Sequence, residues 1–326
     1  MTPKRTAGQF DIAVIGGGAA GLSAAVALGR ARRAVIVLDD GSPRNAPAHG
    51  VHNYLTRDDM PPAELLAAGR REAEGYGSLI INGEATTARR HDDGFEVTTA
   101  SGEVVRARRL LVSTGLADEL PGVPGVRELW GSHVVHCPYC HGWEIADQAT
   151  GVLGSGPMAV HQALLFRQWT SDLLLFVHTA PPPTPEETEQ LTARGIRIVT
   201  GLVERLDTAS GRLAGVRLHD GQFIARTVMV VAPRMVARSH VLNSLGLRPV
   251  PHPLGTAVGE LIESDPNGQT AIPGVWVAGN VTDIQAQVIT AAAQGLAAAA
   301  AINADLIAEE TRRAVERARA RDPAGA

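Results

Sequence analysis

The feature that most constrains the fold of this chain is a glycine-rich turn between a strand pattern and a helix pattern near its start. Phe10–Ile15 is a short apolar run, and the next six residues, Gly16–Gly21, read Gly-x-Gly-x-x-Gly before a helical pattern begins. A second apolar run follows that helix and ends in Asp39 and Asp40. Strand, turn, helix and strand with a terminal acid together predict a dinucleotide-binding βαβ unit, whereas the glycines alone would indicate only a turn.

Each glycine of this turn has a predicted task. Gly16 makes the tight turn, Gly18 lets a pyrophosphate approach the backbone, and Gly21 lets the helix pack closely on the strand. The N-terminus of the helix faces the phosphates, because its free N–H groups attract anions. Asp39 is expected to accept hydrogen bonds from the hydroxyls of the adenosine ribose.

A second strand, turn and helix pattern appears in the middle of the chain. Ala149–Leu153 is apolar, and Gly154–Ala159 reads Gly-Ser-Gly-Pro-Met-Ala, with alanine at the third glycine position. A helical pattern and another apolar run follow, ending at Val177. Two such units in 326 residues predict an α/β protein with two Rossmann-like domains.

The chain holds two cysteines, Cys137 and Cys140, which lie between the two units at the spacing Cys-x-x-Cys. Thiols at this spacing can form and open a disulfide, and a positive neighbour or a helix N-terminus lowers the thiol pKa. His136 and His141 flank the pair, and Pro138 suits the first turn of a helix. We therefore predict a redox-active dithiol. Half of a zinc site or two inert cysteines are the alternatives, and a glutaredoxin would be much shorter.

Composition limits the partners and the compartment. The formal net charge of −4 gives no reason to expect a nucleic acid partner. Residues 1–9 are polar and no cleavable apolar segment follows them, and the alanine-rich stretch 291–301 is too short to span a bilayer. We expect a cytoplasmic protein without a membrane partner or a metal site. In that compartment a persistent disulfide is more often catalytic than structural.

Two later turns have the pattern of ligand-binding positions. One apolar strand ends in Thr114 and Gly115, and another ends in Gly279 and Asn280 before a long helical pattern begins. Each turn follows the carboxyl end of a strand, where α/β folds bind their ligands. The arginine-rich end of the last helix, after Glu309, is interpreted as a solvated helix end without a partner.

With these motifs in this order, the chain resembles the low-molecular-weight thioredoxin reductase family over nearly its full length. The resemblance implies an FAD-binding domain formed by 1–117 and 245–326, with a second domain, 118–244, inserted in it. The inserted domain would have the nicotinamide-binding fold and carry the dithiol, and the protein would be a homodimer. The resemblance also implies that FAD is held by Gly16, Gly18, Ala19, Ala20, Gly21, Asp39, Asp40, Asn53, Thr114, Gly115, Gly279, Asn280, Gln287 and Val288.

Three positions depart from the pattern of that family. The arginines that grip the 2′-phosphate of NADPH are missing from the matching stretch, His178–Thr184, which contains a proline run instead. His141 stands where the family usually has an aspartate that acts as an acid, and a histidine can both take and give a proton near neutral pH. Asn280 stands where an aspartate usually faces the flavin, so an acceptor is kept and a charge is lost.

With these departures the sequence resembles the dithiol oxidases of the family, such as those that close disulfides in gliotoxin, holomycin and romidepsin biosynthesis. The resemblance implies that a small-molecule dithiol attacks the oxidised pair at Cys137 and that Cys140 faces the flavin. His141 or His136 would deprotonate the substrate thiol. The electrons would pass through FAD to O2 and form H2O2.

Two other functions remain open on the sequence. A disulfide reductase fed by NADPH, NADH or ferredoxin would have the same fold, and the missing arginines argue only against its NADPH form. A redox sensor or binding protein without catalysis is the third possibility. Trp130, Tyr139, Trp143, Trp169 and the loop His49–Tyr54 are expected either to line a pocket for a bicyclic dithiol or to belong to the core.

Overall fold

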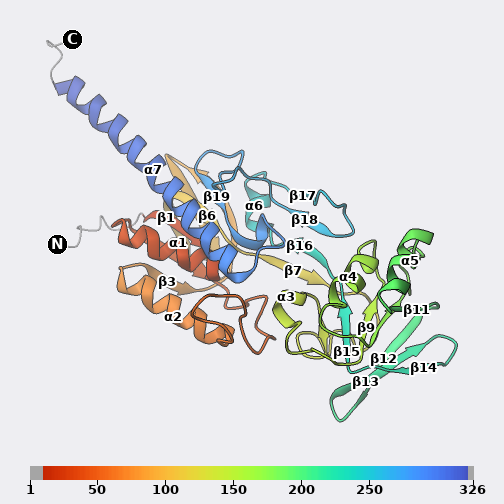
Figure 1. The fold of residues 1–326 in the computed structure, drawn as a ribbon. Helices are drawn as coiled ribbons and strands as arrows, with labels where there is room; N and C mark the ends of the chain where they lie inside the picture. Colours follow the sequence, from red (N-terminus) through yellow and green to blue (C-terminus); the bar gives the residue numbers. More distant parts are fainter. Residues whose placement is uncertain (1–9, 322–326) are drawn as a thin grey trace.

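The computed structural model describes residues 10–321 and shows two layered parts that lie side by side (Figure 1). The N-terminal strands and the long C-terminal helix belong to one part, and the middle of the chain, drawn in green and cyan, forms the other. Residues 1–9 and 322–326 lie outside the described residues, so the expectation of no targeting segment at 1–9 stays a prediction. The predicted α/β class with two Rossmann-type sheets is confirmed.

The larger part is built on a mostly parallel sheet. Within the described residues its seven strands are β1 (Phe10–Ile15), β2 (Val35–Asp39), β3 (Leu79–Asn82), β4 (Ala85–His91), β5 (Gly94–Thr99), β6 (Val104–Val112) and β19 (Val275–Val277). β1 lies between β2 and β6, and β19 pairs with β6, so a strand from near the end of the chain completes this sheet. α1 (Ala19–Arg30) and α7 (Val288–Arg321) pack on one face, and α2 (Pro62–Gly75) lies beside α1.

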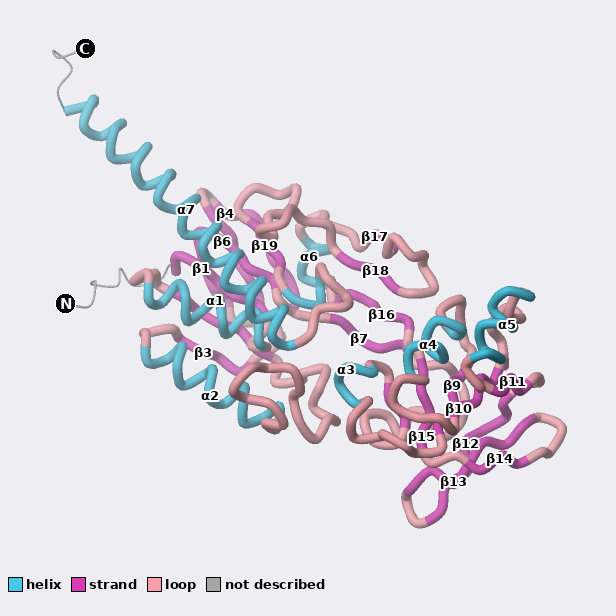
Figure 2. The backbone as a smooth tube through the Cα atoms, viewed as in Figure 1, coloured by secondary structure: helices cyan, strands magenta, loops and turns pink. Residues whose placement is uncertain are grey.

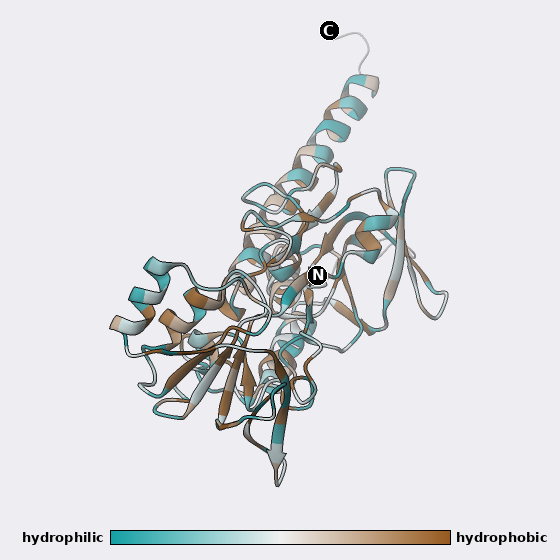
Figure 3. Cartoon of the chain, turned by 90° about the vertical axis from the view of Figure 1, so that its right-hand side faces the viewer, coloured by the Kyte–Doolittle hydropathy of each residue, from teal (hydrophilic) through white to brown (hydrophobic). Residues whose placement is uncertain are grey.

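The central strand shows why these residues form a sheet that is covered on both faces. Ile12 and Val14 of β1 pack with apolar side chains of α1 and α7, whereas Ala13 and Ile15 join the core on the opposite face. All four are buried, as expected for a parallel strand in the middle of a sheet. Figure 3 shows the same pattern, with the most hydrophobic residues gathered in the strands.

The smaller part repeats the arrangement. In the described chain its parallel sheet has the order β11 (Arg197–Val199), β10 (Leu173–Phe176), β9 (Thr150–Leu153), β15 (Val228–Val231) and β8 (Val134–Val135). α4 (Ala159–Phe166) and α5 (Pro185–Ala193) cover one face. The antiparallel strands β12 (Val203–Ala209), β13 (Arg212–Leu218) and β14 (Phe223–Ala225) cover the other. The short helix α3 (Pro138–His141) lies where the two parts meet (Figure 2).

Two paired strands carry the chain between the parts. β7 (Leu116–Glu119) leads out of the larger part and β16 (Arg234–Ala237) leads back, and the two pair along their whole length in antiparallel fashion. β18 (Gly259–Leu261) pairs with β16, and β17 (Val250–Pro251) pairs with β18. The dithiol and the first glycine turn are therefore positioned relative to each other through this small sheet.

α6 (His240–Ser244) follows directly after β16 and contacts the larger sheet. Ser244 Oγ donates to Ala88 O at 2.9 Å, and Ala88 N donates to Ser244 Oγ at 2.8 Å. The predicted division into 1–117 with 245–326 and 118–244 stays a prediction. These contacts favour a return point nearer to β16 than to residue 245.

α7 crosses α1 at very close range, and a glycine makes this possible. A Cβ at Gly295 would lie only 2.0 Å from Ala20 O of α1. Further along the same face Ala298, Ala299 and Ile302 are buried in the core that α1 shares. The last turns of α7 project beyond the body of the protein (Figure 1).

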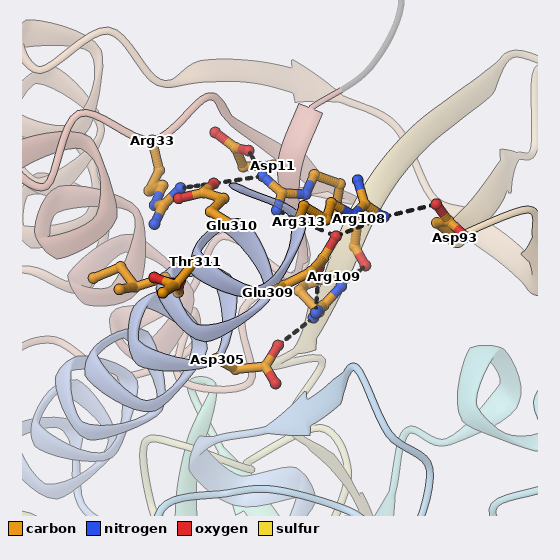
Figure 4. Close-up of polar contacts among 11 residues, drawn as sticks. Asp11, Arg33, Asp93, Arg108, Arg109, Asp305, Glu309, Glu310, Thr311 and Arg313 are labelled. Atoms are coloured by element: carbon orange, nitrogen blue, oxygen red, sulfur yellow. Dashed lines mark hydrogen bonds and ion pairs between the residues drawn. The ribbon is translucent and has the colours of Figure 1, made fainter. Parts of the chain in front are cut away.

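An ion network joins the middle of α7 to strand β6 of the sheet (Figure 4). Arg109 of β6 donates to Glu309 Oε2 at 2.6 Å and to Asp305 Oδ2 at 2.5 Å. Arg313 pairs with the exposed Asp93 at 2.6 Å, and the interpretation of the tail as a solvated helix end without a partner stays a prediction. By length and composition α7 is, within 10–321, the one helix that could cross a membrane, a test that the core helix of a globular protein also passes. The expectation of no membrane partner stays a prediction.

Gly295→Ala should destabilise the protein, because the added methyl group would overlap Ala20 O unless α1 and α7 move apart. We expect a loss of about 1–3 kcal/mol in the free energy of unfolding, measured by urea denaturation. Gly75→Ala is the matched control, since the position of its Cβ is open space at the end of α2 and alanine favours a helix. Equal stability of the two variants would contradict the close crossing.

Candidate functional site

The first glycine turn has the geometry that its sequence predicts. Gly16 has a φ of +106°, which residues with a Cβ rarely adopt, and a Cβ there would lie 2.5 Å from Ser113 O. At Gly21 a Cβ would lie 1.9 Å from Gly16 O, so strand and helix meet through bare backbone. At Gly18, by contrast, nothing lies within 4 Å of the Cβ position, which leaves room for a phosphate at the N-terminus of α1.

Asp39 lies at the end of β2, beside this turn. Its Oδ1 accepts from Gly17 N at 3.0 Å, and its Oδ2 forms an ion pair with Arg70 of α2. The carboxylate is thereby fixed at the turn, and its bond to a ribose stays a prediction. Arg70 was missed by sequence reasoning, because no local pattern links a residue in the middle of a helix to the end of an earlier strand.

One large cavity, of about 1070 Å³, runs from this turn to the dithiol. The predicted site residues that line it are Gly16, Gly18, Ala19, Ala20, Asp39, Asp40, Thr114, Gly115, His136, Cys137, Cys140, His141, Gly279, Asn280, Gln287 and Val288. Two predicted residues do not line it: Gly21 is packed beneath the turn, and Asn53 lies outside the cavity. The fold thus brings segments from both parts of the molecule to one space.

Asn280 lies in the short 3-10 helix η1 (Gly279–Val281) after β19. Its Nδ2 donates to Asp283 O and to Ala286 O, each at 2.9 Å. A carboxylate could not make these donations, because an ionised aspartate has no hydrogen to give. The amide is therefore required by its own loop, and Oδ1 remains as an acceptor.

The dithiol lies at the start of α3, with Cys137 at its N-cap. The two cysteines are not joined by a disulfide, and Cys140 Sγ donates a hydrogen bond to Cys137 Sγ at 2.8 Å. This hydrogen bond, with help from the backbone N–H groups of Cys140 and Tyr139, lowers the pKa of Cys137 to about 7 although burial opposes it. The same coupling, together with burial, raises the pKa of Cys140 far above its ordinary value. Near neutral pH the reduced pair therefore shares one proton, and Cys137 is the thiolate.

His136 and His141 flank the pair, and burial favours the neutral form of both. Burial lowers the pKa of His136 to about 4, and the charge of Arg44 adds to this effect. Burial also lowers the pKa of His141, and Glu144 opposes that shift. A neutral imidazole has a free nitrogen, so either residue can accept a proton. Within residues 10–321 no three His, Cys, Asp or Glu side chains are placed to hold a metal ion.

The loop between β2 and α2 reaches across to α3. Asn53, which has a φ of +60°, donates from Nδ2 to Tyr139 O at 2.6 Å. His52 Nε2 lies 3.4 Å from Glu144 Oε1, just after α3. The contact observed for Asn53 is with the dithiol helix, and its contact with a cofactor stays a prediction.

Arg44, in the same loop, is a second residue that sequence reasoning missed. It lines the cavity together with Cys137 and Cys140, and it forms a bidentate ion pair with Asp118 of β7 at 2.8 and 2.7 Å. The partners are 74 positions apart, and a single arginine beside a proline belongs to no motif. Only knowledge of the three-dimensional contact reveals it.

The expected aromatic pocket forms in part. Trp130 and Tyr139 line the cavity, as does part of the loop that carries His49–Tyr54. Trp169 instead packs edge to face against Tyr139, with ring centroids 6.0 Å apart, and Trp143 is 83% exposed. Trp143 and Trp169 therefore do not line the cavity.

The stretch after β10 folds back onto the first residue of the second glycine turn, whereas Gly156 has an open Cβ position and lines the cavity. Gly154 O accepts from Thr179 N at 3.0 Å and from Ala180 N at 2.9 Å. The backbone N–H groups just after β10 are thus satisfied inside the protein, and the stretch His178–Thr184 contains no arginine or lysine. This stretch therefore offers no fixed positive charge to a 2′-phosphate group.

Comparisons with known proteins agree on one family. The profile of the pyridine nucleotide-disulphide oxidoreductases matches residues 10–295. Thioredoxin reductase tcpT of Claviceps purpurea (strain 20.1) is 31% identical over 84% of this chain and 87% of its own length. Thioredoxin reductase sirT of Leptosphaeria maculans is 30% identical over 90% of this chain and 93% of its own length. Among solved structures, HlmI is similar with a TM-score of 0.90 and 44% identity, covering 98% of this chain and 99% of that chain.

In the reduced protein Cys137 should react with iodoacetamide with a midpoint of about pH 7, and Cys140 should react far more slowly, since only a thiolate is a good nucleophile. Mass spectrometry after timed alkylation over a range of pH measures both sites. Cys140→Ala removes the S–H donor, so the midpoint of Cys137 should rise. A wild-type midpoint near the ordinary value of about 8.5 would contradict the assigned hydrogen bond.

Proposed function

Because this chain belongs to the pyridine nucleotide-disulphide oxidoreductase family and resembles its thioredoxin reductases, we propose that it is a flavin-dependent dithiol oxidase. The family predicted from the sequence is confirmed, and with it an enzyme of thiol/disulfide redox chemistry. The proposal adds the direction of the reaction. A small-molecule dithiol is oxidised to its disulfide through Cys137 and Cys140, and O2 is reduced to H2O2.

The observation that carries this direction is the lack of a positive charge after β10, where the second nucleotide site would bind a 2′-phosphate. The N–H groups of Thr179 and Ala180 are bonded to Gly154 O, and His178–Thr184 has no arginine for a 2′-phosphate. An enzyme that takes electrons from NADPH needs charge-assisted hydrogen bonds to that phosphate. A dithiol substrate needs none, because it delivers its electrons directly to the cysteine pair.

The first glycine turn and η1 fit FAD. The open backbone at Gly18 suits a pyrophosphate, Asp39 would accept a hydrogen bond from the ribose, and Asn280 Oδ1 would accept one from the ribityl chain. The cavity continues from these residues to Cys140, so an extended ligand can span the distance. Bound FAD would supply the electron acceptor that the dithiol requires and would pass the electrons to O2.

The cysteines exchange bonds with the substrate in two steps. A substrate thiolate attacks Cys137 Sγ of the oxidised pair, a substrate–Cys137 disulfide forms, and Cys140 Sγ is released and takes up a proton, in keeping with its raised pKa. The second substrate thiolate then attacks the substrate sulfur of that bond, and the product leaves as a disulfide. Cys137 is the leaving group in this step, and its low pKa favours its departure. Two electrons have moved from the substrate to the cysteine pair.

His141 is the base that we assign to the substrate thiol. A base works best when its pKa lies near the operating pH, and the pKa of His136, about 4, is far below it. The pKa of His141 is lowered by burial, but Glu144 opposes the shift. His141 also follows Cys140 directly and lines the cavity.

The second candidate is a disulfide reductase, in which electrons flow from a donor to the cysteine pair. The names of the relatives favour it, since tcpT and sirT are both called thioredoxin reductases. A reductase fed by NADH or ferredoxin would not need the missing arginines.

We further propose a homodimer located in the cytoplasm. Ile289 and Leu296 on α7 are exposed apolar side chains that a second copy could cover, and light scattering measures the oligomeric state.

Anaerobic spectroscopy of the purified flavoprotein tests the direction. A small dithiol should bleach the visible flavin band, NADPH should leave it unchanged, and air should restore the band with release of H2O2. Cys137→Ser should abolish bleaching by the dithiol while the bound flavin is retained. Rapid bleaching by NADPH would show a reductase instead, and bleaching by neither would indicate a protein donor such as ferredoxin.

His141→Gln should slow bleaching by the dithiol roughly 100-fold, because the substrate thiol loses its base. In the wild type, the rate should fall as the pH drops through the pKa of His141, which lies below 6.5, since the protonated ring cannot accept a proton. His219→Gln is the control, because His219 is exposed and does not line the cavity. A wild-type rate in His141→Gln and a slow rate in His136→Gln would transfer the role to His136.

A further inference from the structure

Arg44 brings a positive charge into the cavity, and the chemistry described above does not use it. Its side chain is 28% exposed, and that of its partner Asp118 is 10% exposed. Arg44 Nε lies 2.8 Å from Asp118 Oδ2, and Nη2 lies 2.7 Å from Oδ1. Two parallel hydrogen bonds of this kind fix the plane of a guanidinium group, which a single contact would leave free to turn.

Arg44 lines the same cavity as Cys137 and Cys140, where the reduced dithiol carries its negative charge. Arg44 favours the anionic form of both Cys137 and Cys140. Asp118 affects His136, but it is not among the main influences on either thiol.

The other titratable groups around the pair do not replace this charge. Glu144 opposes an anion at Cys140, and His136 and His141 are held neutral by burial. His49 and His52, on the loop that carries Arg44, act on His141. Arg44 is thus the permanent positive charge among the groups that act on the thiols.

We propose that Arg44 stabilises the reduced Cys137–Cys140 pair as a monoanion and that Asp118 is the positioning residue that orients it. When a dithiol R(SH)2 reduces the disulfide, the products are the substrate disulfide, one enzyme thiol, one enzyme thiolate and one released proton. A fixed cation favours that proton's release. The inference rests on the proposed function for this reaction only, since the thiolate belongs to the reduced pair in either direction of electron flow.

The pH profile of Cys137 alkylation tests the proposal in the full-length protein, reduced with a phosphine, with neither substrate nor O2 involved. In Arg44→Gln the midpoint should move to higher pH, and the alkylation rate at pH 6 should fall roughly three- to tenfold. Arg44→Lys should restore part of the rate, because it keeps the charge and loses the bidentate geometry. Arg57→Gln is the matched control, because it removes a charge from the same loop outside the cavity lining.

The double variant Arg44→Gln/Asp118→Asn separates the cation from the aspartate that the single variant leaves unpaired. If Arg44 acts on the thiols, the midpoint of Cys137 alkylation in the double variant lies at a higher pH than in the wild type. A double variant with the wild-type profile would overturn the proposal. So would loss of bound flavin in Arg44→Gln with an unchanged profile, which would assign Arg44 to cofactor binding alone. Failure of dithiol oxidation with the predicted profiles would leave this inference standing and reject the proposed direction.

Discussion

The site depends on one loop that holds the dithiol helix against a cavity built mainly by the other part of the molecule. The dithiol is attached to the smaller sheet, whereas the first glycine turn and η1 belong to the larger one. β7 and β16 join the two parts as short paired strands. The loop between β2 and α2 adds contacts across the gap, from Asn53 to the backbone of α3 and from Arg44 to Asp118. In this arrangement residues of both parts line one cavity.

Burial acts differently on the histidines and on the thiols of the site, and the result is a single negative charge beside neutral histidines. It removes the charge of His136 and His141, because a cation loses its hydration there. It also opposes the anion on both sulfurs, but hydrogen bonds outweigh this effect at Cys137 and strengthen it at Cys140. One thiolate next to neutral bases is an arrangement suited to thiol exchange, in which one sulfur attacks or leaves while protons move elsewhere.

The parts of the fold and site that could be predicted from the sequence are those that depend on local patterns. The glycine turn at Gly16–Gly21 and the Cys137–Cys140 pair have fixed spacings, and their strands and helices are strongly apolar. Arg44, Arg70 and the contact of Asn53 could not be predicted, because their partners are distant in the chain and meet them only after both parts have folded. The same reason explains why half of the aromatic residues expected in the pocket lie elsewhere.

The amide of Asn280 links the chemistry of the ligand-facing position to the stability of the loop that follows it. Because Nδ2 donates to two carbonyls of the loop that leads into α7, replacement of Asn280 by aspartate would leave both acceptors without a donor. A change of charge at this position therefore carries a cost within the loop itself, separate from its effect on a bound ligand.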